Sequence, residues 1–204
     1  MSERADLCNI ALGILGESAI TSIDDDSEKA EILKVNYNIA RDATLEAHEW
    51  SFAIKQFVPN RLSNSPEWMY GSQFQVPADI LRVLAVERMP TAASEAYDSV
   101  RSSRARTRAN VDHEVQGRLI LCDEEHIFCT GIRRVEEEGS FSNLFCHALA
   151  AKLAMLICFR LTESSTKFDR AVGLYAGFMK EAKSRDGMQS STRRLVRNAY
   201  AKVR

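Results

Sequence analysis

Apolar positions recur at helical spacing near the N-terminus. The members of this stripe, separated by three, four, seven and eight residues from the first, are Leu7, Ile10, Ala11, Ile14 and Leu15. The stripe predicts a helix over residues 3–15, which Gly16 ends at the position where helices favour glycine. Asp25, followed three residues later by Glu28, predicts a capping box for a second helix that runs to about His48. Its buried face is expected to carry six residues: Leu33, Tyr37, Ala40 and Thr44, widened by Ile32 and Ile39.

The pattern changes in the middle of the chain. Pro59, Pro66, Gly71 and Pro77 exclude one long helix there, and the apolar runs become short. They predict an edge strand over residues 74–76, a strand over 80–86 and a β-meander over 111–130. Residues 91–108 have little apolar content and are expected to form a mobile loop.

The longest apolar segment covers residues 141–161, with Lys152 and Arg160 as its only full charges after Phe141. Such a sequence is typical of a central, buried helix. A further stripe from Phe168 to Ala182 predicts the last core helix. The predicted fold class is therefore mainly α. Residues 1–58 and 140–186 would form a four-helix bundle, 59–139 a small antiparallel β insertion, and 187–204 an extended, flexible C-terminal tail.

Charge is distributed unevenly along the chain. The formal net charge is -1, yet residues 187–204 hold five basic residues and no acid, so the rest carries -6. The tail also has an apolar stripe if it becomes helical, which predicts folding on an acidic, grooved partner. The docking residues expected in this tail are Arg193, Arg194, Leu195, Arg197, Tyr200, Lys202 and Arg204. The loop is expected to contact another protein, and contact with DNA is the less favoured alternative. The residues expected to make this contact are Arg101, Arg104, Arg106 and Arg108.

Motifs of catalysis and cofactor binding do not occur in the sequence. It has no glycine-rich phosphate loop, no GxSxG and no HExxH, so the chain is expected not to be an enzyme and to have no cofactor-binding, catalytic or metal site. The five cysteines are odd in number and irregularly spaced, which favours free thiols in the core over a zinc site. The residues weighed for such a site are Cys122, His126, Cys129, Cys146 and His147. Runs of adjacent acids are expected to be solvated turns, with a hydrolase site as the alternative. Neither a signal-peptide layout nor a membrane span is expected.

Several segments together resemble the head-to-tail adaptors of phages, also called tail tubular protein A or tail accessory factor in short-tailed phages. The first segment is ALGILGESAITSIDDDSEKAEILKVNYNIARDATLEAHEWSFA, which joins a helix ending in LGE to a Trp-Ser-Phe motif. The second is FQVPADILRVLAV, similar to the family's entry into a strand. The third is GRLILCDEEHIFCTGIRRV, followed by the alanine-rich FCHALAAKLAMLICFRLT.

The resemblance implies a structural connector of the phage virion, made in the host cytoplasm and located at the head–tail junction. Such a protein forms a closed ring of about twelve copies beneath the portal protein. It binds the portal ring on one side and a tail or nozzle protein on the other. Genomic DNA passes through its channel without sequence-specific binding, and no cofactor or membrane is involved. Two alternatives remain open at this point: a tail-associated cell-wall hydrolase and a DNA-binding accessory protein.

Overall fold

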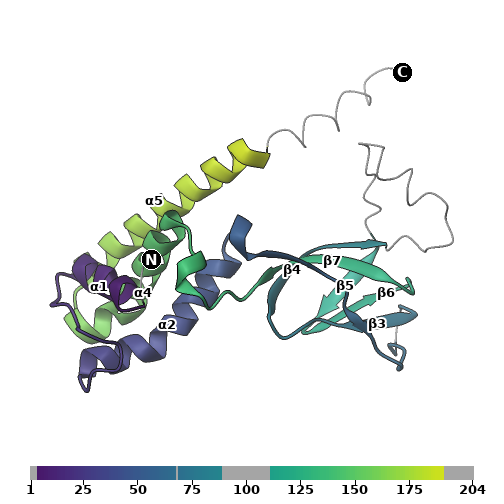
Figure 1. The fold of residues 1–204 in the computed structure, drawn as a ribbon, viewed down its shortest axis with the longest axis horizontal. Helices are drawn as coiled ribbons and strands as arrows, with labels where there is room; N and C mark the ends of the chain where they lie inside the picture. The colour runs from purple at the N-terminus through teal and green to yellow at the C-terminus, as the bar shows by residue number, and fades with distance from the viewer. Residues whose placement is uncertain (1–3, 68, 89–110, 191–204) are drawn as a thin grey trace. The chain divides into compact units, whose positions relative to one another are not determined.

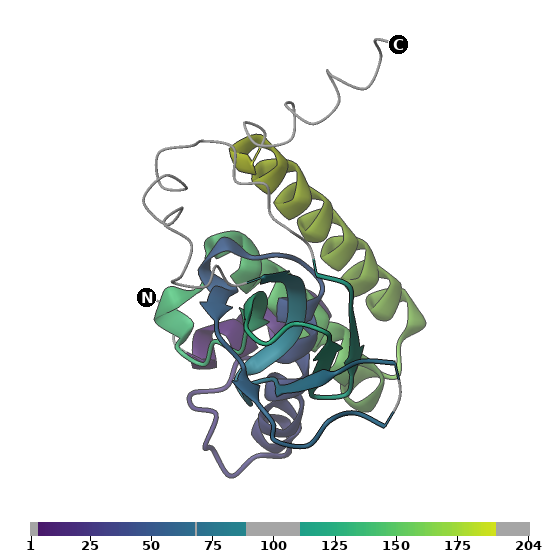
Figure 2. The same ribbon diagram turned by 90° about the vertical axis from the view of Figure 1, so that its right-hand side faces the viewer.

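The protein is represented by a computed structural model that describes residues 4–67, 69–88 and 111–190, with the backbone alone for 186–190. The chain divides into two compact units (Figures 1 and 2). The helical unit comprises residues 1–52 and 135–204, and the β unit comprises residues 53–134. Each unit is built from its own secondary structure and is described separately.

Four α-helices make up the described part of the helical unit. They are α1 (Arg4–Leu15), α2 (Glu28–Glu46), α4 (Asn143–Thr162) and α5 (Ser165–Ser190). Helix α4 packs against the other three, which lie around it in Figure 1. The predicted positions of all four helices are confirmed, and so is the central place of the most apolar one.

The helix ends are set by local chemistry. Gly16 adopts a left-handed φ of 69° after α1, and its N–H donates to the carbonyl of Gly13, while that of Glu17 donates to Leu12. This is the predicted glycine termination. The predicted capping box is wrong, because Ser27 caps α2 by accepting from the Ala30 N–H. Asp25 instead stabilises the preceding turn by accepting from the N–H groups of Thr21 and Ser22.

Helix α4 is long and apolar enough to cross a membrane by length and composition alone, but 56% of its most apolar window is buried within the fold. A core helix of a soluble protein passes the same test, so this composition is weak evidence for a membrane. Burial on three sides explains the apolar sequence without a lipid phase.

Seven strands in two antiparallel sheets form the described part of the β unit. One sheet has the order β1-β7-β4, with β1 (Ile54–Phe57), β7 (Ile127–Arg133) and β4 (Ile80–Arg88). The other has the order β2-β3-β6-β5, with β2 (Asn60–Arg61), β3 (Ser72–Gln75), β6 (Leu119–Cys122) and β5 (His113–Gln116). Residues of both sheets share one apolar core: Phe57, Phe74, Val76, Ile80, Val86, Ile120, Cys122, Ile127 and Cys129.

The predicted fold class is therefore wrong. The protein has a mixed α and β fold, and not mainly a four-helix bundle with a small insertion, because two sheets with a shared core form a unit of their own. The sequence pattern understates this unit because no strand contributes more than two residues to the shared core, and β2 and β5 contribute none, whereas α4 alone supplies a continuous apolar run.

Two details of strand pairing also differ from the prediction. Strand β3 is not an edge strand, since it pairs with β2 on one side and β6 on the other. Residues 111–130 do not form a meander, because β6 joins β5 and β3 while β7 crosses into the other sheet. The hairpin turn at 116–117 is confirmed, with Gly117 at a φ of 60°.

The start of the predicted flexible tail is helical. Helix α5 continues to Ser190, so residues 187–190 extend it instead of forming a tether. Residues 191–204 and the loop 89–110 lie outside the described residues.

Candidate functional site

The outward face of α2 carries two large apolar side chains. Val35 is 65% exposed and Ile39 is 57% exposed, one helical turn apart. The prediction that Ile39 belongs to the buried face is wrong, although Ile32, Leu33 and Tyr37 are buried as expected. These two β-branched residues, one helical turn apart, form an exposed apolar pair, which makes this side of α2 a candidate contact surface.

Acidic residues frame this apolar pair on the same face. Positions 28, 35, 39 and 46 follow at intervals of seven, four and seven residues, which places them within about 40° around the helix axis. Glu28 and Glu46 are exposed at the two ends of this row. We call Glu28, Glu31, Val35, Ile39, Asp42 and Glu46 the α2 face. It has an acidic, apolar, acidic order along the helix.

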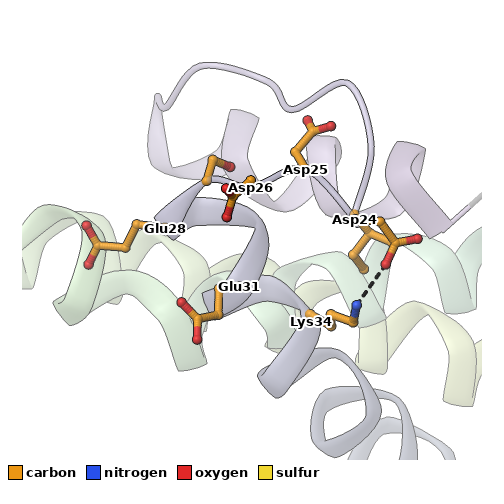
Figure 3. Close-up of a pocket in the computed structure, with 8 residues that line it drawn as sticks. Asp24, Asp25, Asp26, Glu28, Glu31 and Lys34 are labelled. Atoms are coloured by element: carbon orange, nitrogen blue, oxygen red, sulfur yellow. Dashed lines mark hydrogen bonds and ion pairs between the residues drawn. The ribbon is translucent and has the colours of Figure 1, made fainter.

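The turn before α2 adds further negative charge beside the first end of the α2 face (Figure 3). Asp24, Asp25 and Asp26 line a shallow hollow of about 350 Å³ together with Glu28, Glu31 and Lys34. The Lys34 ammonium donates to Asp24 at 2.8 Å, and this hydrogen bond and charge hold the pKa of the Asp24 carboxyl below its usual value. Five carboxylates and one lysine therefore line this hollow, and this excess of negative charge favours a cationic ligand or partner.

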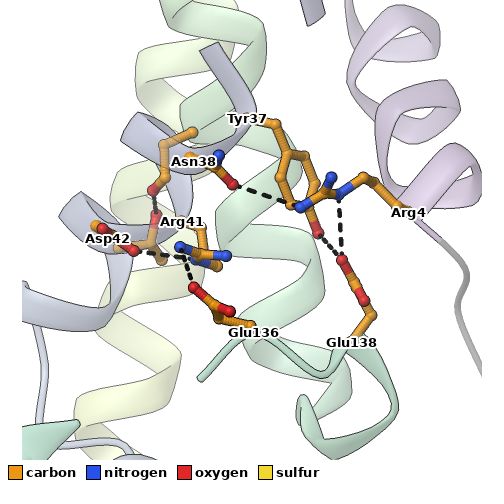
Figure 4. A network of polar contacts seen from close by, with 9 residues as sticks. Arg4, Tyr37, Asn38, Arg41, Asp42, Glu136 and Glu138 are labelled. Carbon is orange, nitrogen blue, oxygen red and sulfur yellow. Dashed lines mark hydrogen bonds and ion pairs between the residues drawn. The ribbon is translucent and has the colours of Figure 1, made fainter. Parts of the chain in front are cut away.

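The opposite side of α2 is fixed by a polar network (Figure 4). Glu138 accepts from the Arg4 guanidinium at 3.2 Å and from the Tyr37 hydroxyl at 3.3 Å. The Arg4 guanidinium also lies over the Tyr37 ring, 4.4 Å from its centre. Burial, and then the Glu138 carboxylate, raise the pKa of Tyr37, so the phenol remains a donor. The network ties α1, α2 and the segment before α4 together.

A second buried cation stabilises the same side. Arg41 is only 3% exposed and donates to Asp42 at 3.0 Å, with Glu136 at 3.8 Å. A buried arginine without such partners would be strongly destabilising. These contacts, with the Ser27 cap, give α2 a single orientation in the helical unit, so the α2 face is displayed on a rigid element.

The site residues predicted from the sequence fall outside the described residues. The docking residues within 193–204 and the four arginines within 101–108 are among them, so their roles stay predictions. The sequence did hold the signal for the α2 face. Val35 is the one apolar residue of α2 that fits no buried stripe, and its neighbour Ile39 lies nearer to it around the helix than to Tyr37 or Leu33.

The cysteines are free and buried, as predicted. Burial raises the pKa of Cys8 to about 11 and that of Cys129 to about 12, so both thiols stay protonated and are poor nucleophiles and metal ligands. Among the residues that the structure describes, no group of three or more His, Cys, Asp or Glu side chains could hold a metal ion.

Three described carboxyls have a pKa that is shifted in the direction opposite to that of a catalytic acid. A catalytic acid needs a raised pKa in an apolar setting. Hydrogen bonds from lysines lower the pKa of three carboxyls in the described part of the chain: Glu17, Asp24 and Asp79. These groups are therefore ionised partners of surface cations.

Comparison with known proteins adds no family assignment. The chain matches no model of a known protein family, and no curated protein is significantly similar to it in sequence. Its function must be inferred from the sequence pattern and from the surfaces described above.

Proposed function

We propose that the chain is a structural, non-catalytic connector subunit of a phage particle. In this proposal, copies form a ring beneath the portal protein, join the capsid to a tail or nozzle protein, and surround the channel through which DNA leaves. The observation that carries it is the α2 face, with Val35 and Ile39 exposed on a helix whose other side is fixed by buried polar contacts. A rigid apolar surface framed by charge is the kind of surface that proteins use to bind one another.

A second apolar surface of the helical unit supports an assembly role. Leu156 and Phe159 of α4 are 41% and 54% exposed, although the rest of α4 is largely buried. Phe159 contacts Phe168 of α5 with ring centres 5.0 Å apart, so this surface has a preformed aromatic part. Arg160 lies next to it and faces Glu28 at 4.0 Å. Subunits of a closed ring use complementary surfaces of this kind.

The sequence resemblance supplies the identity of the assembly. The order of the Trp50-Ser51-Phe52 motif, the strand entry at residues 74–86 and the alanine-rich α4 resembles phage adaptors. In the structure, the Trp50 indole N–H donates to the Thr44 carbonyl, and the Trp50 ring meets Phe145 edge-on at 5.1 Å. The motif thus packs the end of α2 against the start of α4, which is a structural role within the helical unit.

Reconstitution with the portal of the phage that encodes the chain tests this proposal. Purified full-length protein is mixed with portal rings and separated by size, with the double variant Val35→Asp/Ile39→Asp and the control Val115→Asp in parallel. Val115 is 45% exposed on β5 and tests whether any added charge disturbs assembly. We expect wild type and control to comigrate with the portal and the double variant to assemble poorly. Failure of the wild type to bind, together with peptidoglycan hydrolysis or salt-dependent DNA binding, would replace the connector by one of the alternatives.

A further inference from the structure

The outer side of helix α5 is exposed and carries two glycines in its middle. The helix packs against α4 through its opposite side, where Ala171, Met179 and Ala182 are buried. Gly173 and Gly177 lie one turn apart on the exposed side. Glycine is among the least favourable residues in a helix interior. Packing within the chain does not account for these two, because a Cβ added at either position would have nothing to meet within 4 Å.

Charged residues flank the two glycines in a regular pattern. Residues eleven apart lie on nearly the same side of an α-helix, because eleven residues make about three turns. Asp169 and Lys180 therefore border the glycines on one side, and Arg170 and Glu181 border them on the other. Each side has an acid at one end and a base at the other, in opposite orders. These exposed residues together form the α5 face: Asp169, Arg170, Gly173, Gly177, Lys180 and Glu181.

A second copy of the α5 face is complementary to the first. When two α5 helices meet antiparallel about a two-fold axis that crosses them midway between the glycines, each side of one face meets the same side of the other with its ends exchanged. Every acid of the face then lies opposite a base: Asp169 opposite Lys180, and Arg170 opposite Glu181, each twice. The glycines meet at the centre, where the absence of side chains lets the two helices approach closely. The antiparallel direction also brings the partly positive N-terminal end of each helix near the partly negative C-terminal end of the other.

The chain's own C-terminal segment fits this face less well than a second copy does. Residues 191–204 contain five basic residues and no acid, so they offer no partner to the two bases of the face. Within α5, Glu181 accepts from Arg185 at 2.6 Å, whereas the other three charges of the face have no opposite charge three or four positions away. The α5 face has two acids and two bases, and this balance favours a partner with the same balance.

We propose that two copies of the chain bind each other through the α5 face, with the two helices antiparallel. The same surface is used on both copies, so the contact is isologous and closes after two copies. It goes beyond the proposed function and does not rest on it. A ring around one axis repeats a heterologous contact instead, so this dimer belongs to the free protein and has to open before a ring forms.

Substitution of the glycines tests the contact without removing anything that holds the chain together. Gly173→Gln/Gly177→Gln adds side chains where the single chain has room and introduces a better helix former, so the helical content measured by circular dichroism should not fall. Sedimentation velocity of the full-length protein should show a dimer for the wild type and association at least about tenfold weaker for this variant. A monomeric wild type, or a variant that associates like the wild type, would overturn the inference.

Charge reversal decides whether the contact joins two copies. One variant makes the face acidic with Arg170→Glu/Lys180→Glu, and the other makes it basic with Asp169→Lys/Glu181→Lys. Each variant alone should associate at least about tenfold more weakly than the wild type, and an equimolar mixture should regain dimers because the two faces then carry opposite charge. A mixture that stays monomeric would contradict the contact between α5 faces.

Cross-linking tests the antiparallel direction. The two α5 helices place position 173 of one copy opposite position 177 of the other. Gly173→Cys and Gly177→Cys proteins, mixed and treated with a mild disulfide-forming oxidant, should therefore cross-link to each other faster than either does to itself. Faster cross-linking of each protein with itself would contradict this direction.

A matched control and the portal separate this contact from other effects. Glu114→Lys/Glu125→Lys makes the same change of charge as the basic variant, at exposed positions of the β unit, and should dimerise like the wild type. An equal loss in this control would show a general effect of charge and overturn the inference. The outcome is separable from the proposed function. A wild type that is monomeric alone but assembles on the portal refutes the dimer and leaves the connector role standing, and a dimer that never binds the portal does the reverse.

Discussion

Ile39 provides a sharp test of how α2 is oriented, because the pattern of the sequence and the structure place it on different faces. Replacement of Ile39 by Gln keeps a similar helix propensity and removes most of the apolar character. With 57% of the residue exposed, only about two-fifths of its surface is buried. Full burial of an isoleucine side chain is worth about 1.5–3 kcal/mol, so Ile39→Gln should lower the free energy of unfolding by about 1 kcal/mol or less.

Leu33 is the matched comparison on the same helix. It is fully buried, and Leu33→Ala should lower the free energy of unfolding by about 2–5 kcal/mol through lost contacts and a cavity. Urea denaturation followed by circular dichroism, with one slope for all variants, measures both values. A loss for Ile39→Gln as large as that for Leu33→Ala would refute the outward orientation of this side chain, and with it the α2 face.

Three further predictions concern other parts of the chain. Gly131→Ala places a Cβ 2.8 Å from a backbone carbonyl oxygen of β4, so thermal melting should show that the free energy of unfolding falls by about 1–3 kcal/mol. An unchanged melting temperature would mean that β4 and β7 are not paired this closely. Lys55 lowers the pKa of Asp79 from its usual 3.8, so the stabilisation from this ion pair is complete above about pH 5 and is lost as the pH falls through the lowered pKa. Lys55→Met should therefore make the free energy of unfolding less dependent on pH between about 5 and 2. An unchanged pH profile would count against the pair. Cys8 and Cys129 should react with a thiol reagent only in denaturant, because burial keeps them protonated; fast labelling of the native protein at both sites would contradict their burial.

The helices could be predicted from the sequence because each has a complete signal within one segment. The apolar run of α4 and the stripe before Gly16 depend on neighbours three and four residues away. The predicted cap of α2 is wrong for a local reason. Ser27 and Asp25 can both cap a helix, and it is Ser27, directly before the helix, that caps α2.

The β unit was understated because its signal is not local. Phe57 of β1 pairs with Cys129 of β7, more than seventy residues later in the chain. No window of sequence contains both residues, and the segment of β1 follows α2 so closely that it was counted with the helices. The reason for missing the α2 face is different and local: Ile39 is predicted to widen the buried face, although around the helix it lies nearer to Val35 than to Tyr37 or Leu33.

A cryo-electron microscopy reconstruction of the head–tail junction, in any phage whose genome carries this sequence, tests the connector proposal most directly. The proposal predicts a ring of copies directly below the portal, with Val35 and Ile39 of each copy covered by a neighbouring protein. A junction that lacks this chain, or a ring in which the α2 face remains in solvent in every copy, would contradict it.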